Sequence, residues 1–395
     1  MQMLANHIAQ AKPDLVIFTG DIILSKFQQL DAVQFARFME KTGVYWAIVF
    51  GNHEVHEEKG FYKWLMLDSM RRYPHCLALH GDDSLYGYGN YRIDIKNGEN
   101  SLLQSLYLFD SGRDIRERYY KDYGVPEGMK GYDFLKPEQI EWYKNCVRRT
   151  EEKYGKVKSM MYFHIPLPEF EHVMKLDENG QYVPTGEAKI FYGGMYESVG
   201  CSPFNSGMFD AICELGSTQA VYCGHDHIND FCANYKGVCF IYSQCGGYET
   251  YTMGTNFGWP EEKWMQGVTI TEILPDGSIT VGRRFNRDYL KRPEQFNAEN
   301  RHTKKARENN MASSKDYLEY VLEQLSEVGD VTSRAMMSEY ILYFRGKVIG
   351  GIYDNRFLVK PVKAAREMMP DAPEELPYDG AKPMLAVDNI EDKIF

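Results

Sequence analysis

The sequence predicts an α/β protein in which a mostly parallel sheet is flanked by helices, followed by a small α+β module. From residue 14 to residue 74, apolar segments rich in β-branched residues alternate with amphipathic segments, which is a βαβα order. Between residues 234 and 284, short apolar segments separated by glycine-containing turns indicate antiparallel strands. Strands of this kind next to a βα core predict a layered sandwich with helices on the outside.

The individual elements follow from the spacing of the apolar residues. Continuous or alternating apolar runs predict strands at residues 14–21, 44–54, 101–111, 158–166 and 218–227. Apolar residues at helical spacing predict helices at residues 30–43 and 61–74, from Lys136 onward, and at residues 205–216. An opening helix is also expected, because Met1, Leu4 and Ile8 recur at helical spacing.

Composition limits the class of protein. A chain of 395 residues, of which 44% are hydrophobic, is long enough to form more than one domain. No run approaches the roughly 20 apolar residues of a membrane helix, and the first residues do not resemble a signal peptide, so we expect a cytoplasmic protein without membrane contact. Eight cysteines without a CxxC pair are typical of reduced thiols. A net charge of −11 makes nucleic acid an unexpected partner, because phosphate backbones are bound by clustered Lys and Arg.

Side chains that can bind metal ions follow four of the predicted strands. They are Asp21, Asn52, His53, His164, His225 and His227. Because the carboxyl ends of strands in an open α/β sheet share one edge, we expect them to form one site. Carboxylate, amide and imidazole ligands together suit Mn, Fe or Zn rather than a thiolate-bound structural zinc. The two-residue period of a strand predicts that His225 and His227 point the same way, so that two neighbouring metal ions take one imidazole each.

Each motif also has a purely structural interpretation when it is taken alone. A Gly-Asp pair is commonly a turn, a GNHE segment commonly caps a helix, and a single strand-end histidine is more often hydrogen-bonded within the fold than bound to metal. Their combination at the ends of separate strands favours the metal site. Two interpretations of Glu54 stay open, because it either orients His53 or faces water.

The ordered set GD, GNHE, H and GHDH, at residues 20–21, 51–54, 164 and 224–227, resembles the calcineurin-like metallophosphoesterase superfamily over residues 1–290. The segment GYDFLKPEQIEWY, among others, resembles the branch related to purple acid phosphatases. The resemblance implies a four-layer αββα sandwich. It also implies two divalent metal ions, Mn, Fe or Zn, which activate water for in-line attack on a phosphomonoester or phosphodiester substrate.

The same resemblance implies a role for each residue. Asp21 would bridge the two ions, while Asn52, His164 and His225 would complete one metal site with it. His227 would belong to the other site, and His53 would donate a proton to the leaving group. No residue is assigned to substrate binding. The aromatic-rich loops within residues 113–135 and 177–205 either form a specificity wall or pack against themselves.

One motif of the superfamily is missing from the sequence. The superfamily has an Asp-x-His at the end of a first strand, and no such motif precedes Asp21. The second metal site would then keep only Asp21 and His227, and His7 is a poor substitute because it lies within the expected opening helix. We therefore expect a shortened chain that lacks the first strand of the domain, in preference to a natural one-metal protein. Its second metal site would be incomplete, and the chain as given would lack full activity.

A second domain is expected at residues 313–395, after a charged linker at residues 291–312. Residues 313–329 predict a helix, and residues 339–361 predict three strands joined by turns at Arg345-Gly346 and Asp354-Asn355. With its segment YFRGKVIGGIYDNRFLVK, this module resembles the TfoX/Sxy amino-terminal domain, a family associated with the regulation of competence. Ser338 departs from the pattern of that family, and the last helix of such domains is not expected here. The resemblance implies a protein partner for the module, whereas its nearly balanced charges do not favour DNA.

Three functions are compatible with the sequence. The first is a metal-dependent phosphoester hydrolase with an accessory regulatory module. The second is a catalytically impaired protein of the same fold that binds a phosphorylated ligand or a partner. The third is a nuclease, which the acidic composition disfavours.

Overall fold

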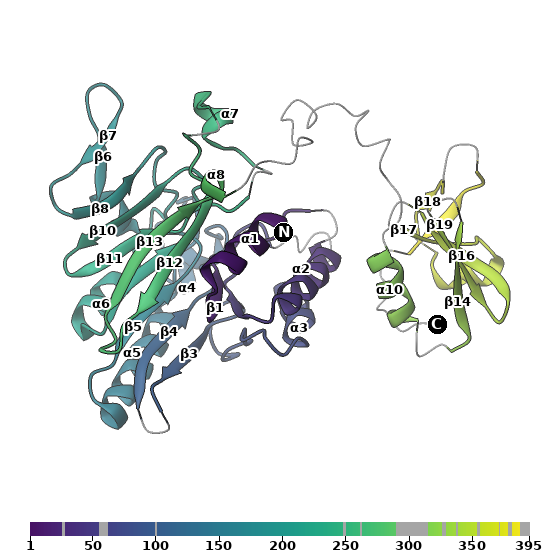
Figure 1. Ribbon diagram of the computed structural model, residues 1–395, viewed down its shortest axis with the longest axis horizontal. Coiled ribbons are helices and arrows are strands. Elements are labelled where there is room, and N and C mark those ends of the chain that lie inside the picture. The colour runs from purple at the N-terminus through teal and green to yellow at the C-terminus, as the bar shows by residue number, and fades with distance from the viewer. Residues whose placement is uncertain are drawn as a thin grey trace. The chain divides into compact units, whose positions relative to one another are not determined.

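The structure is a computed structural model that describes residues 1–25, 28–54, 62–98, 101–247, 250–260, 263–289, 315–325, 329–336, 339–353, 356–370, 372–377 and 381–387. The chain divides into two compact units, Met1–Lys291 and Arg292–Phe395 (Figure 1). The expected linker at residues 291–312 lies outside the described residues.

The first unit contains most of the predicted elements. Its helices are α1 (Gln2–Ala11), α2 (Gln28–Thr42), α3 (Lys63–Arg71), α4 (Arg118–Asp122), α5 (Pro137–Tyr154), α6 (Met208–Leu215), α7 (Met253–Phe257) and α8 (Asn286–Tyr289). Its strands are β1 (Leu15–Phe18), β2 (Tyr45–Ile48), β3 (Tyr91–Lys96), β4 (Leu102–Leu108), β5 (Lys158–Tyr162), β6 (Met174–Leu176), β7 (Tyr182–Pro184), β8 (Lys189–Gly194), β9 (Thr218–Cys223), β10 (Asp230–Tyr235), β11 (Val238–Tyr242), β12 (Gly267–Ile273) and β13 (Ile279–Phe285). The five strands and the helices expected before residue 228 are all present, and β3 and β6 to β8 are additional.

A sheet of seven strands forms the centre of this unit, in the order β3-β4-β5-β9-β11-β10-β8. The four middle strands form parallel pairs, which are β4 with β5, β5 with β9, and β9 with β11. The outer pairs are antiparallel, namely β3 with β4, β11 with β10, and β10 with β8. The antiparallel pairing expected after residue 234 is present between β10 and β11 and between β12 and β13, but β11 has a second, parallel neighbour. β11 pairs antiparallel with β10 through a tight turn, but it also extends the parallel sheet beside β9.

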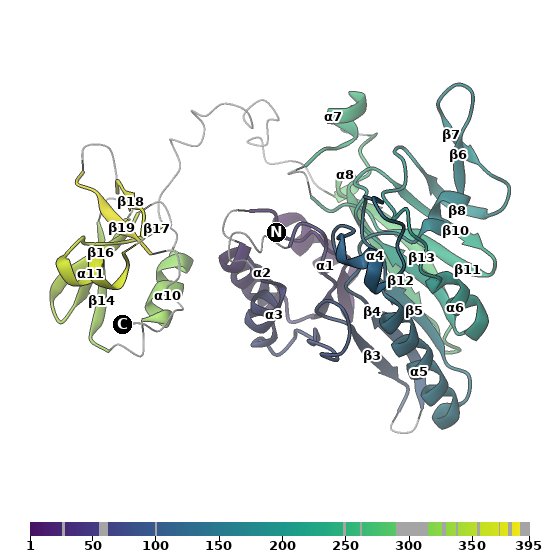
Figure 2. The same cartoon turned by 180° about the vertical axis from the view of Figure 1, so that it is seen from behind.

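Side chains alternate along the central strands between two apolar cores. On one face, Tyr107 and Phe109 pack with residues of α5 and α6 such as Tyr143 and Phe209. On the other face, Leu106 packs with residues of the first three helices and of β1 and β2. This two-residue period places α5 and α6 on the side of the sheet opposite to α1, α2 and α3 (Figures 1 and 2).

On the second face of the seven-stranded sheet, two small sheets lie between that sheet and the helices. β1 pairs parallel with β2, and β12 pairs antiparallel with β13. Both pairs contribute side chains to the same core, among them Ile48 of β2 and Val281 of β13. β1 and β2 therefore do not start the large sheet, as their order in the sequence suggested, but form a separate parallel pair that faces it.

An ion pair connects the small sheet of β12 and β13 to the seven-stranded sheet. Arg283 of β13 donates a hydrogen bond to Asp230 of β10, whose side chain is 3% exposed. Burial raises the pKa of Asp230, and the charge of Arg283 opposes that rise. The stability of the fold depends on this pairing, because a buried charge without a partner raises the free energy of the folded state.

The second unit is built around an antiparallel sheet of six strands in the order β14-β15-β16-β17-β19-β18. Its elements are α10 (Lys315–Gln324), β14 (Val331–Met336), β15 (Glu339–Phe344), β16 (Lys347–Tyr353), β17 (Arg356–Val359), α11 (Lys363–Met368), β18 (Glu374–Glu375) and β19 (Met384–Ala386). The predicted helix and three strands are present, and β14, β18 and β19 extend the sheet. Arg345 and Gly346 both have positive φ in the turn after β15, whereas Asp354 and Asn355 lie outside the described residues.

Within the described parts of the chain, no helix has the length and apolar character needed to cross a membrane.

Candidate metal centre

The candidate site lies at the carboxyl ends of strands from both facing sheets. β1 leads into Asp21, β2 leads into Asn52 and His53, β5 leads into His164, and β9 leads into His225. Asp21 and His225 both adopt left-handed backbone conformations, with φ of 51° and 75°. Such a conformation costs roughly 1–3 kcal/mol for a residue other than glycine, and it is concentrated at functional sites.

The two motif glycines are required by close packing at this point. A Cβ on Gly20, whose φ is 93°, would collide with the ring of His164 and with the backbone of Gly51. A Cβ on Gly51 would collide with the carboxylate of Asp21. Glycine therefore lets the two turns and the His164 ring approach each other, which brings the polar side chains together.

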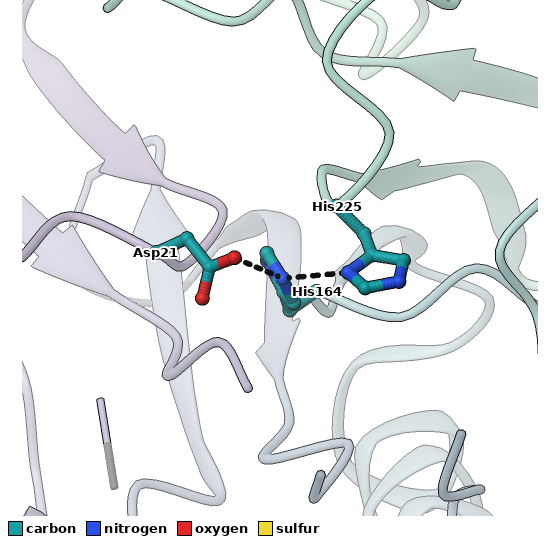
Figure 3. A group of neighbouring side chains, drawn as sticks. All are labelled: Asp21, His164 and His225. Atoms are coloured by element: carbon teal, nitrogen blue, oxygen red, sulfur yellow. Dashed lines mark hydrogen bonds and ion pairs between the residues drawn. The ribbon is translucent and has the colours of Figure 1, made fainter. Parts of the chain in front are cut away.

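Three of the predicted residues form a tight cluster (Figure 3). Asp21 Oδ2 lies 3.0 Å from His164 Nε2, and His164 Nε2 lies 3.2 Å from His225 Nδ1. One ligand atom from each of these residues lies within 4.8 Å of the others. The predicted strand-end residues from the two sheets thus converge on one point.

Asn52 joins the cluster through its side-chain oxygen. Its Oδ1 lies 2.9 Å from His164 Nε2 and 3.1 Å from His225 Nδ1. The resulting set of two oxygen and two nitrogen atoms fits a divalent transition metal such as Zn, Fe or Mn.

The hydrogen bonds also determine which imidazole nitrogen of His164 is available. His164 Nδ1 lies 2.7 Å from the carbonyl oxygen of Thr19. A carbonyl oxygen only accepts, so Nδ1 carries a proton, and Nε2 is the nitrogen that His164 turns toward the cluster. Thr19 was not predicted, because it acts through its backbone and no side-chain pattern reveals such a contact.

The charges of the cluster favour metal binding. Burial by itself would raise the pKa of Asp21, but the hydrogen bond and charge of His164 outweigh it and hold that pKa at about 2. Burial, together with the charge of His164, lowers the pKa of His225 to about 3. An ionised carboxylate and a neutral imidazole are the protonation states in which these groups bind metal.

Glu54 has neither of the two roles considered from the sequence. Its side chain is buried, and its carboxylate accepts hydrogen bonds from the backbone N–H groups of Asp21 at 2.9 Å, Gly51 at 2.6 Å and Ile23 at 3.0 Å. It therefore joins the turn after β1 to the turn after β2. Both earlier interpretations missed this because the contacts are to backbone groups distant in sequence.

His53 lies beside the cluster and is open to solvent. Its side chain is 47% exposed, and its Nε2 lies 4.0 Å from Asp21 Oδ2. Its backbone N–H donates to Asp21 Oδ1 at 2.9 Å, and its carbonyl accepts from Gln28 at 2.6 Å. The backbone is thus held while the imidazole faces outward.

His227 is not a member of the tight cluster. The expectation that the two-residue period of a strand aligns it with His225 is wrong. β9 ends at Cys223, and the left-handed conformation of His225 breaks the alternation of a strand. The charges of Asp21, His164 and His53 nevertheless affect the pKa of His227, which burial lowers. His227 therefore lies near the cluster, through a loop and not through a strand.

Tyr132 was not predicted as a site residue, but its ring packs edge-on against His225 with centroids 4.2 Å apart. Its loop has a small core of its own, which includes Tyr119 and Phe134. Lys136 is buried against these rings and pairs with Asp133. The loop therefore packs on itself, and it also places one tyrosine against the cluster.

His7 lies in α1, where it is buried and its Nε2 lies 2.6 Å from Asn286 Oδ1.

The sequence is similar to those of several known proteins. A stretch of 269 residues is 31% identical to "Probable inactive purple acid phosphatase 29" of Arabidopsis thaliana and covers 62% of each chain. A stretch of 232 residues is 30% identical to "Phosphatase DCR2" of Saccharomyces cerevisiae and covers 56% of this chain and 37% of that protein. The chain thus spans less than two thirds of the length of these relatives.

Among solved structures, a dimetal phosphatase from Danio rerio aligns with a TM-score of 0.40 and 16% identity over 62% of this chain and 77% of that chain. The family model of calcineurin-like phosphoesterases matches residues 1–229, which is more than half of the sequence. The chain therefore belongs to the calcineurin-like phosphoesterase family.

Proposed function

We propose that this protein is a metal-dependent phosphoester hydrolase with a dinuclear centre. The observation that supports it best is the convergence of Asp21, Asn52, His164 and His225 from the ends of four strands, with their oxygen and nitrogen atoms facing one another. Membership of the calcineurin-like phosphoesterase family supports the same class of reaction.

In this proposal Asp21, Asn52, His164 and His225 would hold one divalent ion, and Asp21 and His227 would hold a second. Such ions would supply an activated water for in-line attack on phosphorus and would offset the charge of the phosphoryl oxygens. Glu54 keeps Asp21 at the required place by fixing its backbone. The neutral imidazole of His225 is already in the form that binds metal, and His164 turns Nε2 toward the same point.

His53 is the proposed general acid. Its exposed imidazole stands beside Asp21 without belonging to the tight cluster, which leaves it free to deliver a proton to the leaving oxygen of the ester. Proton transfer of this kind contributes roughly 10²–10⁴-fold to a rate. We propose phosphomonoesters or phosphodiesters as substrates.

The second candidate is a protein of the same fold that binds a phosphorylated ligand without turning it over. It is favoured by the separation of His227 from the cluster of Asp21, His164 and His225. One of the relatives also carries the word "inactive" in its name.

Hydrolysis of a chromogenic aryl phosphomonoester and an aryl phosphodiester in the presence of Mn²⁺ separates the two candidates. The hydrolase predicts a metal-dependent rate that is lost in the His164→Ala variant. The binding protein predicts no rate above that of the variant, together with competition between the ester and inorganic phosphate for the chain.

For the second unit, we propose an accessory TfoX-like module with a protein partner. Support comes from the segment YFRGKVIGGIYDNRFLVK, whose three strands form the middle of the second sheet.

A further inference from the structure

His227 is held by residues from a separate part of the chain. Its Nδ1 lies 2.6 Å from the hydroxyl oxygen of Thr250. Its ring stacks on the ring of Tyr251, with centroids 4.3 Å apart and an angle of 11° between the planes. The two contacts fix one nitrogen and one face of the imidazole.

Tyr251 is itself fixed by a third element. Its hydroxyl donates to Glu197 Oε2 at 2.9 Å and accepts from the backbone N–H of His227 at 3.3 Å. The other oxygen of Glu197 accepts from the backbone N–H of Ile228 at 3.0 Å. Glu197 therefore connects Tyr251 to the loop that carries His227. The hydroxyl of Tyr251 is held both by Glu197 and by the backbone of His227.

These contacts have a consequence for the chemistry of His227. A neutral imidazole has one N–H and one lone pair, and the atom that the Thr250 hydroxyl contacts is Nδ1. If Nδ1–H donates to Thr250, the lone pair is on Nε2, the only ring nitrogen left to bind an ion. His164 shows the same arrangement, since its Nδ1–H donates to the carbonyl of Thr19 and leaves Nε2 toward the cluster.

We infer that Thr250 and Tyr251 are positioning residues that hold His227 with its proton on Nδ1 and its Nε2 lone pair available for the second metal ion. The role of the ion rests on the proposed function, whereas the tautomer and the ring orientation are properties of the chain itself. A histidine that binds metal typically donates its other N–H to such a partner, and loss of the partner weakens binding roughly 10–100-fold.

The test begins without metal. In the full chain labelled with ¹⁵N-histidine at about pH 8, where an ordinary histidine is neutral, the nitrogen shifts of His227 report which nitrogen carries the proton. His227→Gln identifies the signal. We expect the Nδ1–H tautomer in the parent and in Thr250→Ser, and its loss in Thr250→Val, which keeps the shape but removes the hydroxyl. Thr185→Val is the matched control, because its hydroxyl bonds to the carbonyl of His172 away from the site.

Equilibrium dialysis against Mn²⁺ then measures the affinity of each ion. We expect Thr250→Val to weaken the second ion about tenfold or more and Thr250→Ser to restore it. Tyr251→Leu should weaken the second ion more than Tyr251→Phe, which keeps the stacked ring. If Thr250→Val does not fold, Thr250→Ala takes its place in both measurements.

The outcomes separate this inference from the proposed function. A parent in which His227 is protonated on Nε2, or a Thr250→Val variant that keeps the parent tautomer and the parent affinity, overturns the inference and leaves the hydrolase proposal intact. A chain that binds only one ion contradicts the dinuclear centre, and the ¹⁵N shifts still decide whether Thr250 fixes the tautomer.

Discussion

Glu54 Oε2 accepts a hydrogen bond from the backbone N–H of Asp21 at 2.9 Å, although 32 residues separate the two in the sequence. The same oxygen accepts from Gly51, so one buried carboxylate connects both turns that carry the GD and GNHE motifs. The position of Asp21 toward His164 therefore depends on a residue that does not itself face the cluster.

Replacing Glu54 by Gln should destabilise the protein and weaken metal binding. The amide keeps the shape but has one oxygen acceptor, so its NH₂ group is placed against a backbone N–H. An unsatisfied buried donor costs about 1–3 kcal/mol. Denaturant unfolding measures the loss, with Glu152→Gln on the exposed side of α5 as the control. Equal stability of the two variants would show that the Glu54 bonds do not hold the turns.

The His53→Gln variant should keep its metal content and lose activity unevenly. Esters with poor leaving groups should slow by roughly 10²–10⁴-fold, because they need the proton most, while esters with good leaving groups should slow less. Rates over a series of leaving groups measure this dependence. A uniform loss across the series contradicts the role of His53 as the acid.

The buried pair of Lys136 and Asp133 gives a pH-dependent prediction. Burial lowers the pKa of Lys136 to about 8, although the charge of Asp133 opposes that effect. Between about pH 8 and the pKa of roughly 10.4 for lysine in the unfolded chain, the unfolded state binds the proton and the folded state does not, so stability rises with pH in this window. Below about pH 8 the penalty for burying the charge is present in full.

Comparing the parent with Lys136→Met isolates this effect. The free energy of unfolding of the parent, relative to that of the variant, should increase by about 1 kcal/mol or more between pH 8 and pH 9.5. Measurement by urea unfolding at a series of pH values decides the point. A difference that stays constant over this range would mean that Lys136 does not titrate there.

The Arg283→Met variant should lose about 3–5 kcal/mol of stability, because it leaves the carboxylate of Asp230 buried without its partner. Arg148→Met is a suitable control, since the ion pairs of Arg148 with Glu141 and Glu214 are at the surface and contribute at most about 1 kcal/mol. Adding Asp230→Leu to Arg283→Met should recover part of the loss. Similar losses in the free energy of unfolding for Arg283→Met and Arg148→Met would show that the Arg283–Asp230 pair does not stabilise the packing of β13 against β10.

The sequence was sufficient for the elements that local patterns determine. Apolar periodicity located β1, β2, β5 and β9, and the polar residue after each strand then located the cluster. Pairings between distant strands are not encoded locally, which is why the parallel pairing of β11 with β9 and the separate sheet of β1 and β2 were not foreseen.

The supporting residues of the site were harder to predict, for a related reason. Thr19 acts through its carbonyl, Glu54 acts on backbone N–H groups, and Thr250 is far in sequence from His227. None of these contacts requires a repeating pattern or a fixed spacing. The left-handed backbone at His225 likewise has no counterpart in the apolar pattern of the strand that precedes it.

The most direct test of the central claim is the Mn²⁺ content of the full chain after saturation and removal of unbound ion, compared between the parent and His164→Ala. His80→Ala is the control, because His80 bonds to Asp68 and not to the cluster. With a metal centre at this cluster, the parent retains Mn²⁺, His80→Ala retains as much, and His164→Ala loses at least one ion, since one imidazole ligand is gone. Equal metal content in all three proteins, or a parent that retains none, would contradict such a centre.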